Sequence, residues 1–237
     1  MSSPLRSKLT GKAQPRAGQS RSTDKPTAPA NAKTVKRVSS APHQVRIVGG
    51  QWKRTLIRVI DAEGLRPTPD RVRETLFNWL GQDLSGWQCL DLFAGSGALG
   101  FEAASRGAQE VILVENHKTA FAQLQALQEK LQAQQVRLIA GDALGYLQTA
   151  QRRASQFDLI FLDPPFHADW LPRVLPQITA CLKPKGLLYV ESEAVVNGQE
   201  PWCQAYQIVR QGKAGMAHFA LLTHQPTTIA EGAASAP

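Results

Sequence analysis

The chain has 237 residues, 43% of them hydrophobic, with 18 glycines and 15 prolines, which is enough apolar material for one folded core. Its 27 lysines and arginines exceed its 19 aspartates and glutamates and give a net charge of +8 at pH 7. Because no apolar run reaches about eighteen residues and no apolar segment follows the start, neither a membrane span nor a secretory signal is predicted, and we expect a cytoplasmic protein.

Residues 1–44 are expected to form a disordered basic tail. They hold nine lysines and arginines against Asp24 alone, whereas the remaining 18 basic and 18 acidic residues cancel. The segment is rich in Ser, Pro and Ala and lacks apolar periodicity, so it cannot bury enough surface to offset its ordering entropy. It either touches phosphate or is a dispensable extension. Residues 45–237 form the one folded domain, with residues 225–237 as a second disordered tail.

Residues 45–80 are predicted to form a small β-ribbon followed by a helix. Alternation in residues 46–48 and 56–60 indicates two short strands. Thr68 and Pro69 are expected to supply the N-cap and the first turn of a helix that ends near Leu80. This stretch is the one basic part of the folded region.

A glycine-rich turn occupies residues 88–103, which read Q-C-L-D-L-F-A-G-S-G-A-L-G-F-E-A. Gly95, Gly97 and Gly100 let the backbone pass close to a ligand, and the helix that follows offers free N–H groups. They also satisfy the dinucleotide pattern G-x-G-x-x-G, and Glu115 lies at the end of the next apolar run, where a carboxylate would bind ribose hydroxyls. The turn fits a nicotinamide dinucleotide and S-adenosylmethionine equally well.

Asp91 favours the second ligand. A pyrophosphate gains nothing from a carboxylate just before the glycines, whereas the ammonium and sulfonium of S-adenosylmethionine are cationic. Asp142, after the apolar stretch of residues 136–140, is expected to reach the adenine amine; the alternative is a helix cap. The candidate cofactor contacts on these turns are Asp91, Phe93, Gly95, Ser96, Gly97, Glu115, Asp142 and Ala143.

Residues 157–166, F-D-L-I-F-L-D-P-P-F, carry the most specific pattern. A buried strand ends there, because Pro164 and Pro165 cannot continue a ladder of backbone donors. The rigid carbonyls of Asp163 and Pro164 can accept hydrogen bonds from the exocyclic amine of a nucleobase, and Phe166 offers a face for stacking. Asp163, Pro164, Pro165 and Phe166 are therefore the catalytic candidates. An ordinary turn is the alternative.

The order of segments predicts an α/β fold with a doubly wound sheet. Strand candidates alternate with helix candidates, and two further strands, at residues 205–210 and 216–223, are joined by a G-K-A-G turn. The result is a seven-stranded sheet, mostly parallel, with a C-terminal antiparallel hairpin. The strand candidates are residues 88–93, 110–115, 136–140, 157–162 and 187–191, and the helix candidates are residues 97–106, 117–133, 143–152 and 168–182.

The three cysteines and five histidines show no ligand spacing, so no metal site is predicted. Cys89, Cys181 and Cys203 lie in or beside apolar segments and are expected to be small core residues.

Taken together, D-L-F-A-G-S-G-A-L-G, Glu115, Asp142 and D-P-P-F resemble a class I S-adenosylmethionine-dependent amino-methyltransferase. The blocks V-R-I-V-G-G-Q-W-K-R-T-L and G-L-R-P-T-P-D-R-V-R-E-T-L-F-N-W-L are similar to the bacterial 16S ribosomal RNA guanine-N2 methyltransferase family, over about residues 45–224. The resemblance implies a Rossmann-like core at residues 81–224, S-adenosylmethionine as methyl donor and a guanine exocyclic amine as acceptor. It also implies 16S rRNA in a partly or fully assembled small subunit as substrate, and no metal; we expect a monomer.

With this resemblance, the basic stretch becomes the candidate RNA surface. Its cations would hold RNA phosphates and Trp52 would stack on a nucleotide, unless the tryptophan is half-buried over the ribbon. In related enzymes the matching helix start folds over the methyl donor, so Thr68 and Arg71 are also candidates for its carboxylate. The RNA-binding candidates are Arg46, Trp52, Lys53, Arg54, Arg66 and Arg73.

Four other functions stay open at this point. A DNA or other RNA amino-methyltransferase would use the same D-P-P-F loop, although a DNA enzyme generally needs a larger recognition insert. A protein glutamine methyltransferase would more often have asparagine at position 163. A nicotinamide oxidoreductase requires that the D-P-P-F loop be only a turn. A non-enzymatic RNA-binding module would tolerate the loss of Glu115 and Asp163.

Overall fold

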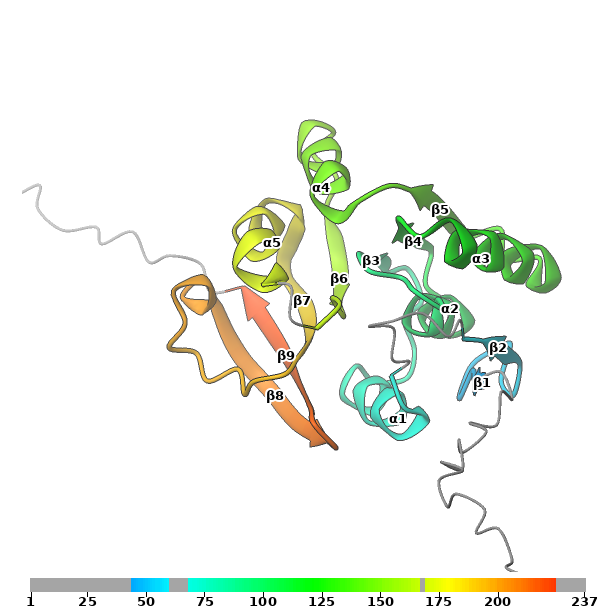
Figure 1. The fold of residues 1–237 in the computed structure, drawn as a ribbon, viewed down its shortest axis with the longest axis horizontal. Helices are drawn as coiled ribbons and strands as arrows, with labels where there is room; N and C mark the ends of the chain where they lie inside the picture. Colours follow the sequence, from blue (N-terminus) through cyan, green and yellow to red (C-terminus); the bar gives the residue numbers. More distant parts are fainter. Residues whose placement is uncertain (1–43, 60–67, 167–168, 225–237) are drawn as a thin grey trace, which may run out of the picture. The chain divides into compact units, whose positions relative to one another are not determined.

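Seven strands form one sheet in the order β5-β4-β3-β6-β7-β9-β8 (Figure 1). The computed structural model describes residues 44–59, 68–166 and 169–224. The first five strands in chain order are parallel, and β9 lies antiparallel between β7 and β8, which confirms the predicted Rossmann-like α/β fold. The strands are β3 (Gln88–Asp91), β4 (Glu110–Glu115), β5 (Val136–Ala140), β6 (Phe157–Leu162), β7 (Leu182–Ser192), β8 (Tyr206–Ala214) and β9 (Ala217–His224).

The chain reverses its direction of winding between β3 and β6. From β3 it moves outward to β4 and β5, and it then returns to β6 on the other side of β3. In open α/β sheets of this kind, ligands bind outside the carboxyl ends of the strands at this switch point. A ligand site is therefore expected at the carboxyl ends of β3, β4 and β6.

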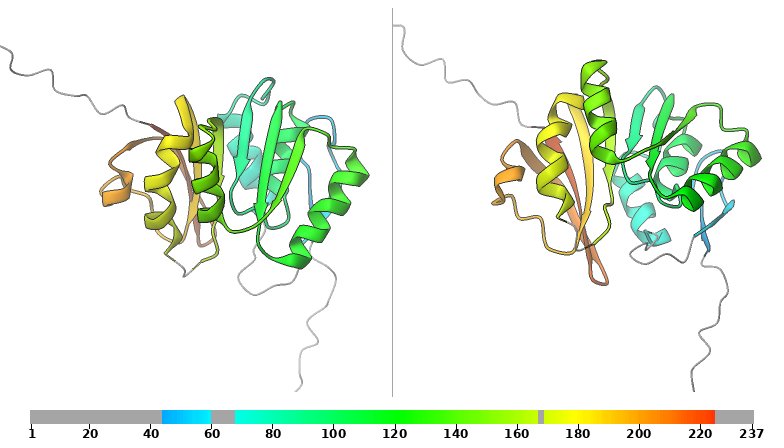
Figure 2. Two further views of the ribbon diagram at one scale, coloured as in Figure 1. Left: turned by 90° about the horizontal axis from the view of Figure 1, so that it is seen from above. Right: turned by 45° about the horizontal axis from the view of Figure 1, so that its top comes forward.

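Helices cover both faces of the sheet (Figures 1 and 2). Successive strand residues point to opposite faces, so Val111 and Leu113 pack under one helix layer while Ile112 and Val114 pack under the other. The first layer holds α1 (Asp70–Trp79), α2 (Ala98–Ser105) and α3 (Lys118–Leu131), and the second holds α4 (Ala143–Arg152) and α5 (Trp170–Ile178).

The predicted ribbon is formed by β1 (Gln44–Arg46) and β2 (Leu56–Arg58), which pair antiparallel. It is docked onto α2 by Glu102, which is fully buried and accepts the backbone N–H groups of Val48 and Gly49 at 2.7 Å each. Gly50 has φ +71° and lies so close to α2 that a Cβ atom would stand 1.9 Å from the carbonyl oxygen of Ser105. The V-G-G-Q block is therefore a docking element.

The helix expected at residues 168–182 ends at Ile178 and is followed by a 3-10 helix at Thr179–Cys181. Two further element boundaries differ from the prediction. β7 begins at Leu182, because this residue already pairs with Phe157 of β6. An irregular Lys-Pro-Lys segment follows, in which Lys185 has φ +66°, and pairing resumes at Leu187. The expected G-K-A-G turn is mostly strand, and the chain reverses only at Gly215 and Met216. Sequence patterns miss both features because glycine, proline and lysine are poor strand formers whose pairing here is imposed by neighbouring strands.

Several expectations fall on residues that the structure does not describe. Residues 1–43 and 225–237 of the two predicted tails and Arg66 are among them, whereas Gln44, which was expected to belong to the first tail, begins β1. Cys89, Cys181 and Cys203 are buried and free, as predicted. Over residues 44–59, 68–166 and 169–224, no helix has the length and apolar character of a membrane span, and no three His, Cys, Asp or Glu side chains are grouped as metal ligands would be.

Candidate active site

A cavity of about 580 Å³ lies at the carboxyl ends of four neighbouring strands. Each strand contributes a carboxylate: Asp91 from β3, Glu115 from β4, Asp163 directly after β6 and Glu191 from β7. Neither lysine nor arginine is among the described residues that line it. The cavity is therefore built for a ligand that carries positive charge.

Most of the predicted site residues meet in this cavity. The structure brings together all four catalytic candidates and most of the cofactor candidates. Three cofactor candidates, Gly97, Asp142 and Arg71, are not in the lining. The predicted residues that line the cavity are Thr68, Asp91, Phe93, Gly95, Ser96, Glu115, Ala143, Asp163, Pro164, Pro165 and Phe166.

The glycine turn is held in place by Glu115. Its Oε2 accepts the N–H of Gly95 at 2.7 Å, and its Oε1 accepts the N–H of His117 at 2.7 Å. Gly97 has φ +79° and precedes the first turn of α2, where a Cβ atom would lie 2.6 Å from Leu124 Cδ2. Gly95 thus borders the ligand space, whereas Gly97 allows the close packing of α2 on α3.

Asp91 is 1% exposed and keeps one carboxylate oxygen unsatisfied. Oδ2 accepts the N–H of Gly100 at 3.0 Å, whereas Oδ1 has no hydrogen-bond partner among the described residues. Burial raises the pKa of Asp91 to about 7, and the charges of Glu115 and Glu191 add to the rise, whereas the backbone N–H groups of Gly100 and Phe93 oppose it. A buried acceptor without a donor is costly, so this oxygen fits a cationic group of a bound ligand.

Asp163 is half-buried, and both it and Glu191 lie within hydrogen-bond distance of the Thr68 hydroxyl. Thr68 Oγ1 donates to Glu191 Oε1 at 2.7 Å and lies 3.3 Å from Asp163 Oδ2. The hydroxyl of Tyr189 donates to the same Glu191 oxygen at 2.9 Å. Burial, and then the charges of Glu191 and Asp91, raise the pKa of Asp163 well above its ordinary value, while the Thr68 contact opposes the rise.

The expected N-cap role of Thr68 is wrong. Pro69 is the N-cap residue of α1, and among the described residues no side chain caps that helix. The Thr68 hydroxyl turns instead toward Asp163 and Glu191 in the cavity, because the buried carboxylate of Glu191 needs a donor there.

The structure corrects the RNA-binding assignment of Arg73. Its side chain is fully buried and donates to the backbone carbonyls of Thr68 and Arg46 and to Asp70 Oδ1, the last at 2.8 Å. A guanidinium enclosed in this way cannot reach a phosphate. Arg73 instead ties the start of α1 to the ribbon and holds Thr68 at the cavity.

Trp52 is buried, so its ring covers the ribbon, which was the alternative in the sequence analysis. A buried ring is not available to stack on a nucleotide. Its ring packs edge-on against Phe101 of α2 with 6.4 Å between ring centroids. Lys53 and Arg54 are exposed beside it, and Arg46 is exposed but pairs with Asp70 at 2.7 Å.

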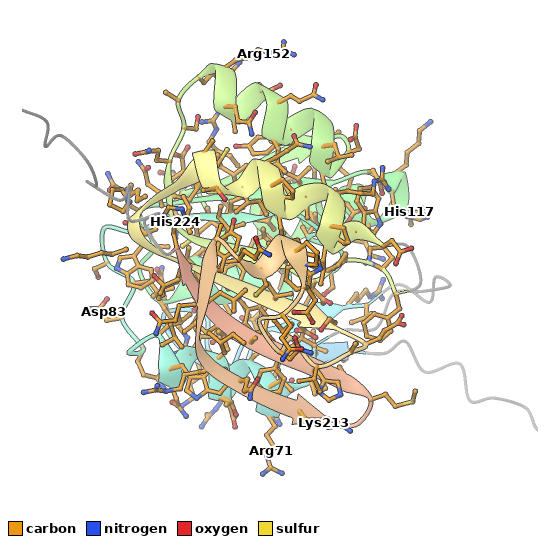
Figure 3. All side chains as sticks on the ribbon, turned by 90° about the vertical axis from the view of Figure 1, so that its left-hand side faces the viewer. Arg71, Asp83, His117, Arg152, Lys213 and His224 are labelled. Atoms are coloured by element: carbon orange, nitrogen blue, oxygen red, sulfur yellow. The ribbon has the colours of Figure 1, made fainter. Side chains whose placement is uncertain are left out.

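Two further candidates stand outside the cavity lining. Asp142 caps α4, with Oδ1 accepting the N–H of Gly145 at 2.9 Å, which is the alternative considered for it. Arg71 is exposed and points away from the protein (Figure 3). A contact of either side chain with the cofactor stays a prediction.

Glu191 is the site residue that the sequence analysis missed, together with Asn116, His117 and Trp170 of the lining. A sequence signal for Glu191 was present. It follows the apolar run of residues 187–190, just as Asp91, Glu115 and Asp163 follow theirs.

The chain is similar to known proteins along most of its length. The family model described as "Conserved hypothetical protein 95" matches residues 45–223. Ribosomal RNA small subunit methyltransferase D of Haemophilus influenzae is 43% identical over 158 residues, which cover 65% of this chain and 81% of the relative. The protein of the same name from Escherichia coli K12 is 39% identical over 184 residues, covering 77% and 91%.

Two solved structures are also similar to this chain. A putative methyltransferase from Escherichia coli is 38% identical with a TM-score of 0.66, and the match covers 77% of this chain and 99% of that one. A putative methylase from Haemophilus influenzae is 34% identical with a TM-score of 0.65, and the match covers 78% and 100%. The chain therefore belongs to the ribosomal RNA small subunit methyltransferase D family and is a methyltransferase.

Proposed function

We propose that this methyltransferase transfers a methyl group from S-adenosylmethionine to the exocyclic N2 amine of a guanine in 16S ribosomal RNA of the small subunit. The observation that carries the proposal is the acidic cavity with the Asp163–Phe166 loop on its wall. The names of the relatives support ribosomal RNA of the small subunit as the substrate.

The donor side of the cavity suits S-adenosylmethionine. When bound, this cofactor supplies an electrophilic methyl group and carries positive charge on its sulfonium and ammonium groups. Asp91 Oδ1 would accept from the ammonium, and Glu115 would accept from the ribose hydroxyls, because each of its oxygens keeps a lone pair beside the bond it already receives. A nicotinamide dinucleotide fits poorly, since its pyrophosphate would face four carboxylates.

Other lining residues would surround the adenosine part of the donor. Phe93, Ser96 and Ala143 lie in the same cavity as Asp91 and Glu115. Phe93 meets Trp170 edge-on, with 5.2 Å between the ring centroids, so the pair forms an apolar wall that suits a flat purine.

On the acceptor side, Asp163 and the Pro164 carbonyl would accept the two N–H groups of the guanine amine. The lone pair of this amine is delocalised into the ring, and hydrogen bonds to fixed acceptors favour a nitrogen that can attack the methyl carbon. Positive charge develops on the nitrogen, and a preorganised carboxylate is worth about 3 kcal/mol at such a position. Phe166, which also lines the cavity, would stack on the base.

The exposed cations of the ribbon suit the RNA backbone. Lys53 and Arg54 lie on the β1–β2 turn, and Val59, just after β2, lines the cavity. Phosphates held on this turn would place a nearby nucleotide at the cavity. We also propose that the substrate is 16S rRNA in a partly or fully assembled small subunit.

The test is transfer of a labelled methyl group to small-subunit particles, naked 16S RNA and duplex DNA. We expect label in the particles, and nuclease digestion followed by mass spectrometry should identify N2-methylguanosine. Label in DNA alone, or on another base, would sink the proposal. Calorimetry with S-adenosylmethionine and with NAD separates the two cofactor classes.

A further inference from the structure

The hydroxyl of Thr68 stands between two carboxylates at the wall of the cavity. It donates to Glu191 Oε1 at 2.7 Å and lies 3.3 Å from Asp163 Oδ2. A hydroxyl has a single proton and two lone pairs, so it donates to one carboxylate at a time. While it donates to Glu191, its lone pairs face Asp163, and this second contact becomes a hydrogen bond when Asp163 carries a proton.

Two of the three groups in this chain are nearly closed to solvent, whereas Asp163 is half-buried at the cavity. Thr68 is 4% exposed and Glu191 is 5% exposed. Tyr189 donates to the same oxygen of Glu191 at 2.9 Å, and the guanidinium of Arg73 donates to the backbone carbonyl of Thr68. The backbone of Thr68 and the Glu191 end of the hydroxyl bridge are thereby held in position before any substrate arrives.

We propose that Thr68 and Glu191 are positioning residues that take the amine proton from Asp163 and so return Asp163 to its accepting form. This inference rests on the proposed function, because it requires an amine that loses a proton when it is methylated. Neither residue needs to touch the base. Both act through Asp163, the residue that faces it.

The proton and electron changes balance over the sequence of steps. A nitrogen–carbon bond forms at the amine while the carbon–sulfur bond breaks, and the sulfur keeps the electron pair. An N–H bond of the methylated amine then breaks, and the proton goes to Asp163 Oδ2. Thr68 Oγ1 takes this proton while its own proton passes to Glu191 Oε1. Asp163 and Thr68 regain their initial forms, and Glu191 holds one proton until the products leave.

The charges around Glu191 suit this role. It faces Asp163 and Asp91, which are acidic, the guanidinium of Arg73, and the hydroxyl of Tyr189. Burial raises the pKa of Glu191, and the hydrogen bonds from Thr68 and Tyr189 and the charge of Arg73 oppose the rise. A buried glutamate with a raised pKa is a better proton acceptor than an exposed one.

Three variants test the relay: Glu191→Gln, Thr68→Val and Thr68→Ser. The steady-state rate of methyl transfer over many turnovers is measured against pH, with S-adenosylmethionine and small-subunit particles in excess over the enzyme, because the relay restores Asp163 after each transfer. Loss of the proton acceptor or of the hydroxyl should slow transfer by about tenfold or more, whereas serine, which keeps the hydroxyl, should stay within about threefold of wild type. The double variant Glu191→Gln with Thr68→Val should be no slower than the slower single variant, because the two residues act as one unit.

The pH profiles check that Glu191 and Thr68 both act on Asp163. The negative charge of Glu191 raises the pKa of Asp163, and the Thr68 contact lowers it. The acid limb of the rate profile should therefore move to lower pH in Glu191→Gln and to higher pH in Thr68→Val. General loosening of the site would not move the two limbs in opposite directions.

Glu102→Gln is the matched control. Glu102 is a buried carboxylate of the same domain that binds Val48, Gly49 and Arg106 away from the cavity lining, so its variant should lower thermal stability without moving the acid limb. The relay would be overturned if the wild type transfers methyl groups but Glu191→Gln and Thr68→Val keep its rate, or if their acid limbs move in the same direction. The proposed function would then remain intact. Absence of transfer by the wild type would overturn both.

Discussion

Asp91 Oδ2 accepts the backbone N–H of Gly100 at 3.0 Å, while its other oxygen, at the cavity, has no hydrogen-bond partner among the residues that the structure describes. The carboxylate thus anchors the first turn of α2 with one oxygen and keeps the other for a ligand. The arrangement costs stability, because burial raises the pKa of Asp91 to about 7. Such a cost is typical of a binding site that is prepared in advance for a cation.

The first prediction concerns the stability of Asp91→Asn. Near pH 4 the folded wild type holds Asp91 protonated, so the variant and wild type should melt at similar temperatures. As pH rises from 3.8 to about 7, the unfolded chain ionises this group first, and the free energy of unfolding of wild type falls. At about 1.4 kcal/mol per pKa unit, the variant should be more stable at pH 8 by up to roughly 4 kcal/mol. Thermal unfolding at both pH values checks this, and equal melting temperatures at pH 8 would contradict it.

The second prediction concerns the pH dependence of S-adenosylmethionine binding. A cationic ligand favours the ionised forms of Asp91, Asp163 and Glu191, whose pKa values are raised in the free protein. Binding near pH 7 should therefore release protons, and affinity should increase as pH rises through this range. Calorimetry in buffers with different ionisation enthalpies measures the protons released. Asp91→Asn should release fewer and bind more weakly; equal release in both proteins would argue against an ionised Asp91 in the complex.

The ends of the strands were the most predictable part of the site. Asp91, Glu115 and Asp163 each follow an apolar run, and the parallel sheet brings them to one edge, so periodicity alone placed them together. The same rule applied to residues 187–191 would have found Glu191. The order of strand and helix patterns predicted the doubly wound sheet for the same reason, since each local pattern agrees with the overall fold.

The roles of Thr68 and Arg73 could not be predicted from local sequence. Thr68 precedes a proline and a helix, which favours an N-cap, but its hydroxyl is directed by Glu191, more than a hundred residues away along the chain. Arg73 belongs to a basic stretch that is typical of a phosphate-binding surface, yet the backbone carbonyls of Thr68 and Arg46 enclose it. Both outcomes depend on partners that only the tertiary fold supplies.

The third prediction separates donor binding from methyl transfer. Asp163→Ala should leave the affinity for S-adenosylmethionine within a few fold, because Asp91 and Glu115 are intact, while methyl transfer is abolished. Calorimetry and a methyl-transfer assay on small-subunit particles measure the two effects. Asp83→Ala, at an exposed carboxylate outside the cavity lining, should keep both (Figure 3). An equal loss of binding and transfer in Asp163→Ala would count against its acceptor role.

The fourth prediction concerns the exposed cations of the ribbon. Lys53→Ala together with Arg54→Ala should weaken binding to small-subunit particles and reduce the slope of log affinity against log salt by about 0.7–0.9 for each RNA phosphate that these cations neutralise in wild type. Donor affinity should not change, because neither side chain lines the cavity. The matched control removes the same charge from the exposed end of α4, with Arg152→Ala and Arg153→Ala (Figure 3). Equal slopes in the two double variants would place the RNA surface elsewhere.

The fifth prediction concerns residues 1–44, whose nine lysines and arginines against a single acid account for the whole net charge. Because the rest of the chain is neutral, long-range attraction to RNA should depend on this segment. Its removal should reduce the association rate and the salt slope, and the reduction should be largest at low ionic strength, where screening is weakest. Single-turnover transfer at saturating particle concentration should keep its wild-type rate, since the described residues that line the cavity all lie beyond position 58. An unchanged salt slope would make the segment a bystander, and a lower saturating rate would give it a part in placing the base.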